Sequence, residues 1–151
     1  MNTKHMSFPS KVSRFRSLYN NLIQERLIER RITDLHTSYG NILFALYKND
    51  KQTMKSLASS INRDKSTLTV IVRKLEKRGY VTRVKNPQDY RSKLIELTHK
   101  GIELKPIFLE ISTEVNEVLW GSITETEADE LSGLLDRVIT NISSYSCNIN
   151  D

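Results

Sequence analysis

Two short helical patterns, a glycine and two strand-like runs follow one another between Thr53 and Thr98, and this order constrains the fold most. In both helical patterns, apolar residues recur every three or four positions, as they do on the buried face of an α-helix. In chain order these residues are Met54, Leu57, Ala58 and Ile61, then Leu68, Ile71, Val72 and Leu75. Thr53 and Asp64 precede the two patterns, where a side-chain oxygen can cap the first turn of a helix.

The second half of this stretch has the pattern of a β-hairpin. Gly79 adopts positive φ at low cost and is suited to end the preceding helix. The runs Tyr80–Val84 and Leu94–Leu97 are short and alternating or apolar, as in strands. They flank a polar, basic loop that contains the turn formers Asn86 and Pro87. The order of elements predicts a winged helix-turn-helix, in a mainly α fold with a small β-hairpin wing.

Amphipathic helices are predicted on both sides of the stretch, because apolar residues again recur in steps of three and four. One helix covers residues 11–31, and the predicted caps of the others are Thr37 or Ser38, Thr98, and the capping box of Thr124 with Glu127. We expect a loosely ordered lead-in up to Pro9, a bend caused by Pro106 near residues 102–105, and a frayed tail from Ser143 onward.

Positive charge is concentrated in the middle of the chain. Residues 48–105 hold 15 Lys and Arg against 6 Asp and Glu, whereas residues 110–151 hold 9 acids and a single Arg. A block this basic beside one this acidic indicates a module that binds a polyanion and a separate, solvated helical arm. A solvated surface of mixed charge would not predict such segregation.

The sequence has no features of an exported or membrane protein. No stretch approaches the roughly 18 consecutive apolar residues that a membrane helix needs, and the N-terminus lacks the apolar segment of a signal peptide. Cys147 is the only cysteine, so an internal disulfide is impossible. We therefore expect a cytoplasmic protein with no membrane partner. Cys147 either has no special role or acts as an oxidation switch.

The helix that follows Asp64 presents a polar, basic face opposite its apolar one. Short hydroxyl side chains near its N-terminus allow close approach to a DNA groove, and long cationic side chains can reach base edges or phosphates. We predict that it binds DNA through Lys65, Ser66, Thr67, Thr69, Val70, Arg73 and Lys74. Val70 either packs against the preceding helix or contacts a thymine methyl group.

The loop of the hairpin is a second candidate device for binding DNA. A hairpin with a basic tip can insert an Arg into a narrow minor groove, where the negative potential is enhanced. Arg91 is the best candidate, with Asp89 and Lys93 beside it. Asp89 either braces the guanidinium of an arginine such as Arg91 or forms a solvated surface pair of little energetic value.

These residues give the chain a resemblance to the MarR family of bacterial and archaeal transcriptional regulators. The matching runs are Leu57-Ala58, Asp64 to Thr69, Leu75 to Val81, the residues Asp89, Arg91 and Lys93, Leu97-Thr98 and Gly101. The chain departs from the family pattern at Val70, where many relatives carry a basic residue. It also departs at Gly40-Asn41, near the region where relatives bind phenolic ligands.

The resemblance implies one domain over residues 1–151. Dimerisation helices would cover residues 11–34 and 99–146, and the winged helix-turn-helix would cover residues 37–98. It implies a homodimer that binds a pseudo-palindromic operator in double-stranded DNA. We expect a repressor, released by a small-molecule effector whose identity the sequence does not give.

Other classes of function have less support. His5, His36 and His99 are isolated and lack the spacing of a metal site. The sequence has neither a Gly-rich phosphate loop nor a Gly-x-Ser-x-Gly motif, so we expect no enzyme activity, metal or cofactor. The remaining alternative is a winged-helix module that binds proteins only, and the retained basic residues Arg73 and Arg91 argue against it.

Overall fold

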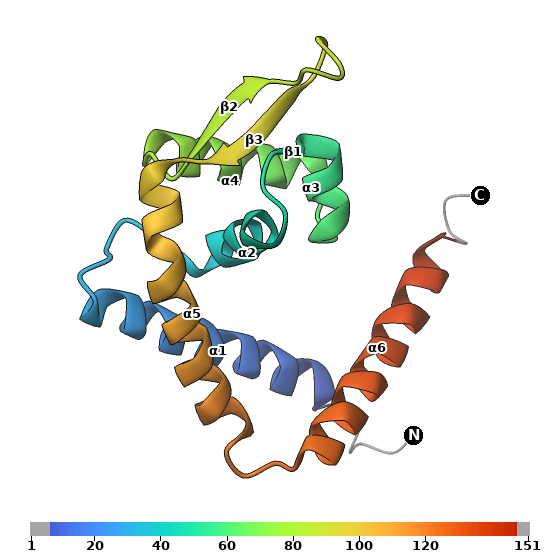
Figure 1. Cartoon of the computed structure of the whole chain (residues 1–151). Helices are drawn as coiled ribbons and strands as arrows, with labels where there is room; N and C mark the ends of the chain where they lie inside the picture. The colour runs from blue at the N-terminus through green and yellow to red at the C-terminus, as the bar shows by residue number, and fades with distance from the viewer. Residues whose placement is uncertain (1–6, 148–151) are drawn as a thin grey trace. The chain divides into compact units, whose positions relative to one another are not determined.

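A computed structural model describes residues 7–147, and the chain divides into two compact units, Met1–Ser112 and Thr113–Asp151. The fold is mainly α with a small β-sheet, which confirms the predicted class. In chain order (Figure 1) the elements are α1 (Phe8–Glu29), the 3-10 helix η2 (Thr37–Tyr39), α2 (Gly40–Lys48), β1 (Gln52–Thr53), α3 (Met54–Ser60), α4 (Lys65–Lys77), β2 (Val81–Lys85), β3 (Lys93–Leu97), α5 (His99–Trp120) and α6 (Glu125–Cys147). Within residues 7–147, no helix is both long and apolar enough to cross a membrane.

Helices α3 and α4 form the predicted helix-turn-helix. The hydroxyl oxygen of Thr53 accepts a hydrogen bond from the N–H of Ser56 at 3.1 Å. The carboxylate of Asp64 accepts one from the N–H of Thr67 at 2.8 Å, so both predicted caps are confirmed. Between the helices, Asn62 adopts a φ of 49°, a left-handed conformation that Asn tolerates better than most residues. This turn reverses the chain so that α4 packs against α3.

An apolar core fixes α4 in place. Three residues of α4 are wholly buried, and so is one residue each of α2, α3 and β3: Leu68, Val72 and Leu75, then Ile42, Leu57 and Ile95. Burying a side chain of this size stabilises the folded state by about 1.5–3 kcal/mol relative to leaving it exposed. Ile71, which was also predicted to be buried, is half-buried. The core therefore determines which face of α4 remains exposed.

A third strand joins the predicted hairpin. Strands β2 and β3 are antiparallel, with Val81 opposite Leu97. Strand β1 pairs with the other edge of β3, so the order is β1-β3-β2. The sequence did not predict β1, because two residues are too few to show an alternating pattern. Gln52 of β1 is buried, and its side-chain amide donates to the carbonyl of Ala45 at 3.1 Å.

The start of α1 differs from the sequence prediction. The helix begins at Phe8 rather than near Lys11, so Pro9 lies in its first turn instead of in a loose lead-in. A proline is tolerated there, because the first N–H groups of a helix have no partner within the helix.

The second helical region also begins differently from the prediction. Its first turn is the 3-10 helix η2, and the residue that caps it is His36, not Thr37 or Ser38. The ring nitrogen Nδ1 of His36 accepts a hydrogen bond from the N–H of Ser38 at 3.2 Å. Helix α2 then starts at Gly40, so the cap lies upstream of the predicted position.

The junction of β3 with α5 is tightly packed. Thr98 caps α5 as predicted, since its hydroxyl oxygen accepts a hydrogen bond from the N–H of Gly101 at 3.2 Å. A Cβ atom at Gly101 would overlap the backbone oxygen of Tyr80. Helix α5 continues through Pro106 without a break in its assignment, and the bend expected there stays a prediction.

In the second unit, Thr124 and Glu127 form the predicted capping box of α6. The N–H of Thr124 donates to Glu127 Oε2 at 2.9 Å, and the N–H of Glu127 donates to Thr124 Oγ1 at 3.3 Å. Helix α6 extends to Cys147. The prediction that the chain is frayed from Ser143 onward is therefore wrong for residues 143–147. The prediction for the Cys147 side chain falls outside the described residues.

The packing at Gly101 leads to a prediction for stability. Gly101→Ala should lower the free energy of unfolding by about 1–3 kcal/mol, because a backbone atom cannot move aside as a flexible side chain can. Gly40→Ala is the matched control, since its Cβ would meet only Phe108 at 3.8 Å, an ordinary contact. Chemical denaturation of both variants measures the difference, and equal stability of the two would contradict the packing.

Candidate nucleic-acid interface

Helix α4 carries one continuous exposed face opposite the buried core. The seven residues of α4 that were predicted to bind DNA all lie on it: Lys65, Ser66, Val70, Arg73 and Lys74 are exposed, and Thr67 and Thr69 are half-buried. The side chain of Val70 is 51% exposed, so packing against α3 does not bury it.

The hydroxyl groups at the start of α4 already donate hydrogen bonds within the chain. Ser66 Oγ donates to the capping carboxylate of Asp64, and Thr69 Oγ1 donates to the carbonyl of Lys65 at 2.7 Å. Hydrogen bonds from Ser66 and from Thr67 hold the pKa of the Asp64 carboxyl well below its usual range. In this conformation the side chains that can donate to an anion are therefore mainly the lysines and arginines.

A basic hollow lies where α3 turns into α4. It has a volume of about 470 Å³ and is lined by Lys55, Ala58, Ser59, Asn62, Arg63 and Lys65. Only Lys65 was predicted from the sequence as a DNA-binding residue. Lys55 and Arg63 were missed, because helical periodicity marks the buried positions of α3 but does not show which exposed cations gather around the turn.

The loop at the tip of the wing is held by its own hydrogen bonds. The side-chain oxygen of Asn86 accepts from the N–H of Gln88 at 3.0 Å, and its amide nitrogen donates to Ser92 Oγ at 2.8 Å. The N–H of Ser92 donates to the carbonyl of Asp89 at 3.0 Å. Figure 1 shows this loop projecting away from the helices. The wing therefore presents its tip in a defined conformation.

Asp89 supports Arg91 through the backbone rather than through the guanidinium. Its carboxylate accepts a hydrogen bond from the N–H of Arg91 at 3.0 Å. The guanidinium is held instead by Tyr90, whose phenol oxygen accepts from Arg91 Nε at 3.2 Å and whose ring lies 5.5 Å from the guanidinium carbon. Among the described residues, no bond joins the Asp89 carboxylate to a guanidinium, so the structure shows neither of the two alternatives considered for Asp89, the bracing or the surface pair. Tyr90, which is 86% exposed, was missed because a lone exposed aromatic has no periodic pattern.

An ion pair connects α4 to the wing. Arg83 Nε on β2 donates to Glu76 Oε2 on α4 at 3.2 Å, and both side chains are partly buried. Partial burial strengthens such a pair relative to one in bulk water. The pair joins α4 to the hairpin, the two parts of the chain that were predicted from sequence to bind DNA.

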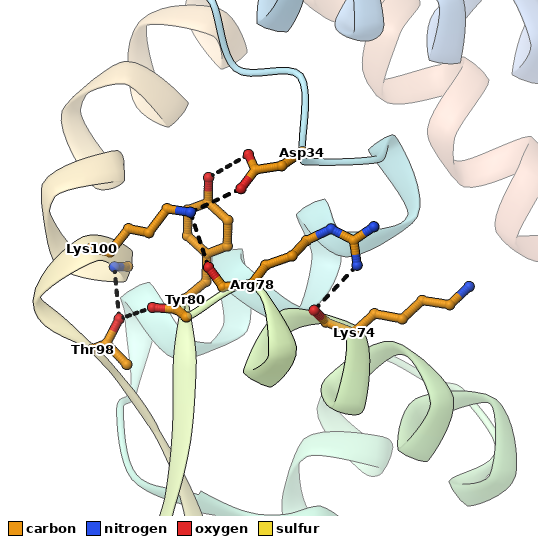
Figure 2. Close-up of polar contacts among 8 residues, drawn as sticks. Asp34, Lys74, Arg78, Tyr80, Thr98 and Lys100 are labelled. Carbon is orange, nitrogen blue, oxygen red and sulfur yellow. Dashed lines mark hydrogen bonds and ion pairs between the residues drawn. The ribbon is translucent and has the colours of Figure 1, made fainter.

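A polar network holds the far end of α4, and Figure 2 shows its members. Asp34, in the linker between α1 and η2, accepts hydrogen bonds from Tyr80 OH and from Lys100 Nζ, each at 2.8 Å. Lys100 Nζ also donates to the carbonyl of Arg78 at 3.0 Å. Arg78 in turn donates to the carbonyl of Lys74 at 3.3 Å. The network therefore joins the linker, the end of α4 and the first turn of α5.

Burial and charge shift the pKa values within this network. Burial raises the pKa of the Tyr80 phenol, and the hydrogen bond to Asp34 raises it further. Burial alone would raise the pKa of Asp34 as well. Hydrogen bonds from Lys100 and Tyr80 and the positive charge of Lys100 outweigh that effect, so the pKa of Asp34 lies below its usual value. Asp34 is thus ionised and Tyr80 is neutral at neutral pH.

Comparison with known proteins agrees with this architecture. A profile of the MarR family matches residues 39–93. The HTH-type transcriptional regulator SarZ of Staphylococcus haemolyticus is 37% identical over 113 residues, which cover 75% of this chain and 76% of SarZ. The chain therefore belongs to the MarR family of winged helix-turn-helix transcriptional regulators.

Two solved structures show the same fold at lower sequence identity. MepR of S. aureus, solved as a complex with DNA, has a TM-score of 0.78 and 24% identity, over 89% of this chain and 97% of MepR. The organohalide-sensing regulator RdhR-CbdbA1625, solved with bound 2,4-dichlorophenol, has a TM-score of 0.80 and 24% identity, over 93% of this chain and 82% of that protein.

The network around Asp34 leads to a prediction for stability and its pH dependence. Asp34→Asn should lower the free energy of unfolding at pH 7 by about 1 kcal/mol, because it weakens charge-assisted hydrogen bonds that are partly exposed. The folded-state pKa of Asp34 is depressed, so its stabilisation is present above about pH 4 and is lost as the pH falls through that pKa.

Denaturation curves from pH 7 to pH 3 measure this contribution. The variant should lose less stability than the wild-type protein over that range. Thr33→Ala is the control, because Thr33 is an exposed residue of the same linker. The network would be shown to be unimportant if Asp34→Asn matched the wild-type curve at every pH.

Proposed function

We propose that the chain is a sequence-specific DNA-binding transcriptional regulator in which α4 lies in the major groove and the wing reaches the adjacent minor groove. The observation that carries the proposal is the exposed basic face of α4 opposite a wholly buried one. An α-helix fits the major groove of B-DNA, and a helix held by its core keeps its side chains in register with the base edges. The DNA complex of the similar regulator MepR supports the proposal.

We assign different roles to the cations of the helix-turn-helix. Arg73 and Lys74 are exposed on α4 and long enough to reach base edges or phosphates. Lys65 lines the basic hollow with Lys55 and Arg63, where three cations converge at the turn. Such a cluster suits a backbone phosphate, which positions the protein on DNA without reading its sequence.

We assign the minor groove to the tip of the wing. Arg91 is exposed at the tip, and Tyr90 and Asp89 hold its side chain and its backbone. Lys93 adds a further exposed cation at the start of β3. A guanidinium held in this way loses less conformational freedom when it enters a narrow groove, where the negative potential is strongest.

We propose a homodimer, with residues 11–34 and 99–146 forming its interface. Helices α1 and α6 each expose large apolar side chains: Phe8, Val12, Phe15 and Leu18 on α1, and Leu131, Leu134, Leu135, Ile139 and Ile142 on α6. Monomeric proteins rarely expose apolar patches of this extent. A two-fold dimer presents two copies of α4, which suits a pseudo-palindromic operator.

We propose repression as the direction of regulation, because a dimer on its operator blocks other proteins from the same DNA. The proposed effector class is a small molecule, which the 2,4-dichlorophenol complex of the similar regulator supports without giving an identity. A ligand releases the protein from DNA only if it binds the DNA-free conformation more tightly than the bound one.

Selection of binding sites from randomised duplexes tests this function. The protein should enrich a pseudo-palindrome with half-sites about 10 base pairs apart, and its affinity for DNA should fall steeply as salt is raised. Arg91→Ala should weaken binding to the selected duplex by about 1–3 kcal/mol. Lys105→Ala removes the same charge from an exposed position on α5 and serves as the control.

Three outcomes of these experiments would each contradict one part of the proposed function. A selection that returned no preferred sequence would contradict sequence-specific binding, and a single half-site in place of a palindrome would contradict the dimer. An Arg91→Ala variant with the wild-type dissociation constant at fixed salt would remove Arg91 from the residues that contact DNA.

A further inference from the structure

One side chain on the exposed face of α4 has no polar atom. Val70 is 51% exposed, whereas Val72, two residues further along the same helix, is wholly buried. Exposing an aliphatic side chain to water contributes nothing to the stability of the chain alone. On a face proposed to lie in a groove of DNA, contact with the partner would remove this surface from water.

Val70 lies at the centre of the face that we assign to the major groove. On an α-helix, side chains three and four residues apart are neighbours on the same face. Val70 therefore has Ser66 one turn before it and Arg73 and Lys74 one turn after it, and all three are exposed. A residue in this position lies nearer to the floor of a groove than those at the margins of the face.

The neighbours of Val70 toward the start of α4 offer few free hydrogen-bond donors. The hydroxyl of Ser66 donates to Asp64, and the hydroxyl of Thr69 donates to the carbonyl of Lys65. Val70 is β-branched and held near one χ1 rotamer in a helix, so its methyl groups have a defined position. At the centre of the face, Val70 therefore presents a fixed apolar surface. On one side of it is the Ser66 hydroxyl, which already donates to Asp64, and on the other are the cations Arg73 and Lys74.

The major groove of DNA offers one kind of apolar group to such a surface, the C5 methyl of a pyrimidine. Thymine carries this methyl group, and cytosine carries it only when methylated at C5. We propose that Val70 is a specificity-determining residue that packs against a pyrimidine C5 methyl in each half-site. This inference rests on the proposed function. It adds the chemical group of the DNA base that Val70 would contact.

Deoxyuridine substitution in the selected duplex tests this contact, because deoxyuridine differs from thymidine only by the methyl group. Thymines of the half-site are replaced one position at a time, symmetrically in both halves. At one position the wild-type dissociation constant should rise by roughly fifteenfold, since burying one methyl group is worth about a fourfold change in each of the two half-sites. Val70→Ala should show a smaller loss of affinity on the same substitution, because the alanine side chain covers less of the methyl group.

Two controls assign the effect to the methyl group and to Val70. Ser66→Ala changes the same face without removing an apolar group, so its ratio of thymine to deoxyuridine affinities should equal that of the wild-type protein. Placing a cytosine at the sensitive position, with and without a C5 methyl, separates the methyl from the other groups of thymine. The methylated cytosine should bind the wild-type protein more tightly, by about the same fourfold factor in each half-site.

Val70→Ala is expected to fold, because its side chain is outside the core and Ala is the better helix former. Equal deoxyuridine penalties in the wild-type protein and in Val70→Ala would overturn the inference, as would a half-site with no sensitive thymine. Either result would leave sequence-specific binding intact. A selection that enriched no duplex at all would instead overturn the proposed function, and this inference with it.

Discussion

The candidate interface depends on the buried apolar contact between α3, α4 and β3. Leu57, Leu68 and Ile95 meet in this core without exposure to solvent. Interiors of this kind are close-packed, so a shift of α4 would open cavities that the neighbouring side chains cannot fill. Because the core holds one face of α4, the opposite face and the hairpin that continues from it are presented in fixed directions.

Polar contacts near the C-terminal end of α4 add to the apolar core. The pair of Glu76 with Arg83 ties α4 to β2, and Asp34 ties the end of α4 to the linker before η2 through Tyr80 and Lys100. The bonds of Asp34 join segments that are distant in sequence, whereas the pair of Glu76 with Arg83 spans the turn between α4 and β2.

Local signals made the helix-turn-helix and the hairpin predictable from sequence. The caps at Thr53 and Asp64 and the stop at Gly79 each depend on neighbouring backbone atoms, so the residue types alone indicate them. Strand β1 and the partner of the Arg91 guanidinium were not predictable in this way. The pairing of β1 depends on a distant strand, and Tyr90 acts through a loop geometry that no periodic pattern encodes.

In the proposed complex, α4 and the wing read different grooves of one duplex. Footprinting with dimethyl sulfate tests it directly, because this reagent methylates guanine N7 in the major groove and adenine N3 in the minor groove. Two blocks of guanine protection about one helical turn apart should be flanked by adenine protection, and Arg91→Ala should lose only the adenine protection. Simultaneous loss of both, or protection confined to one groove in the wild-type complex, would contradict the account.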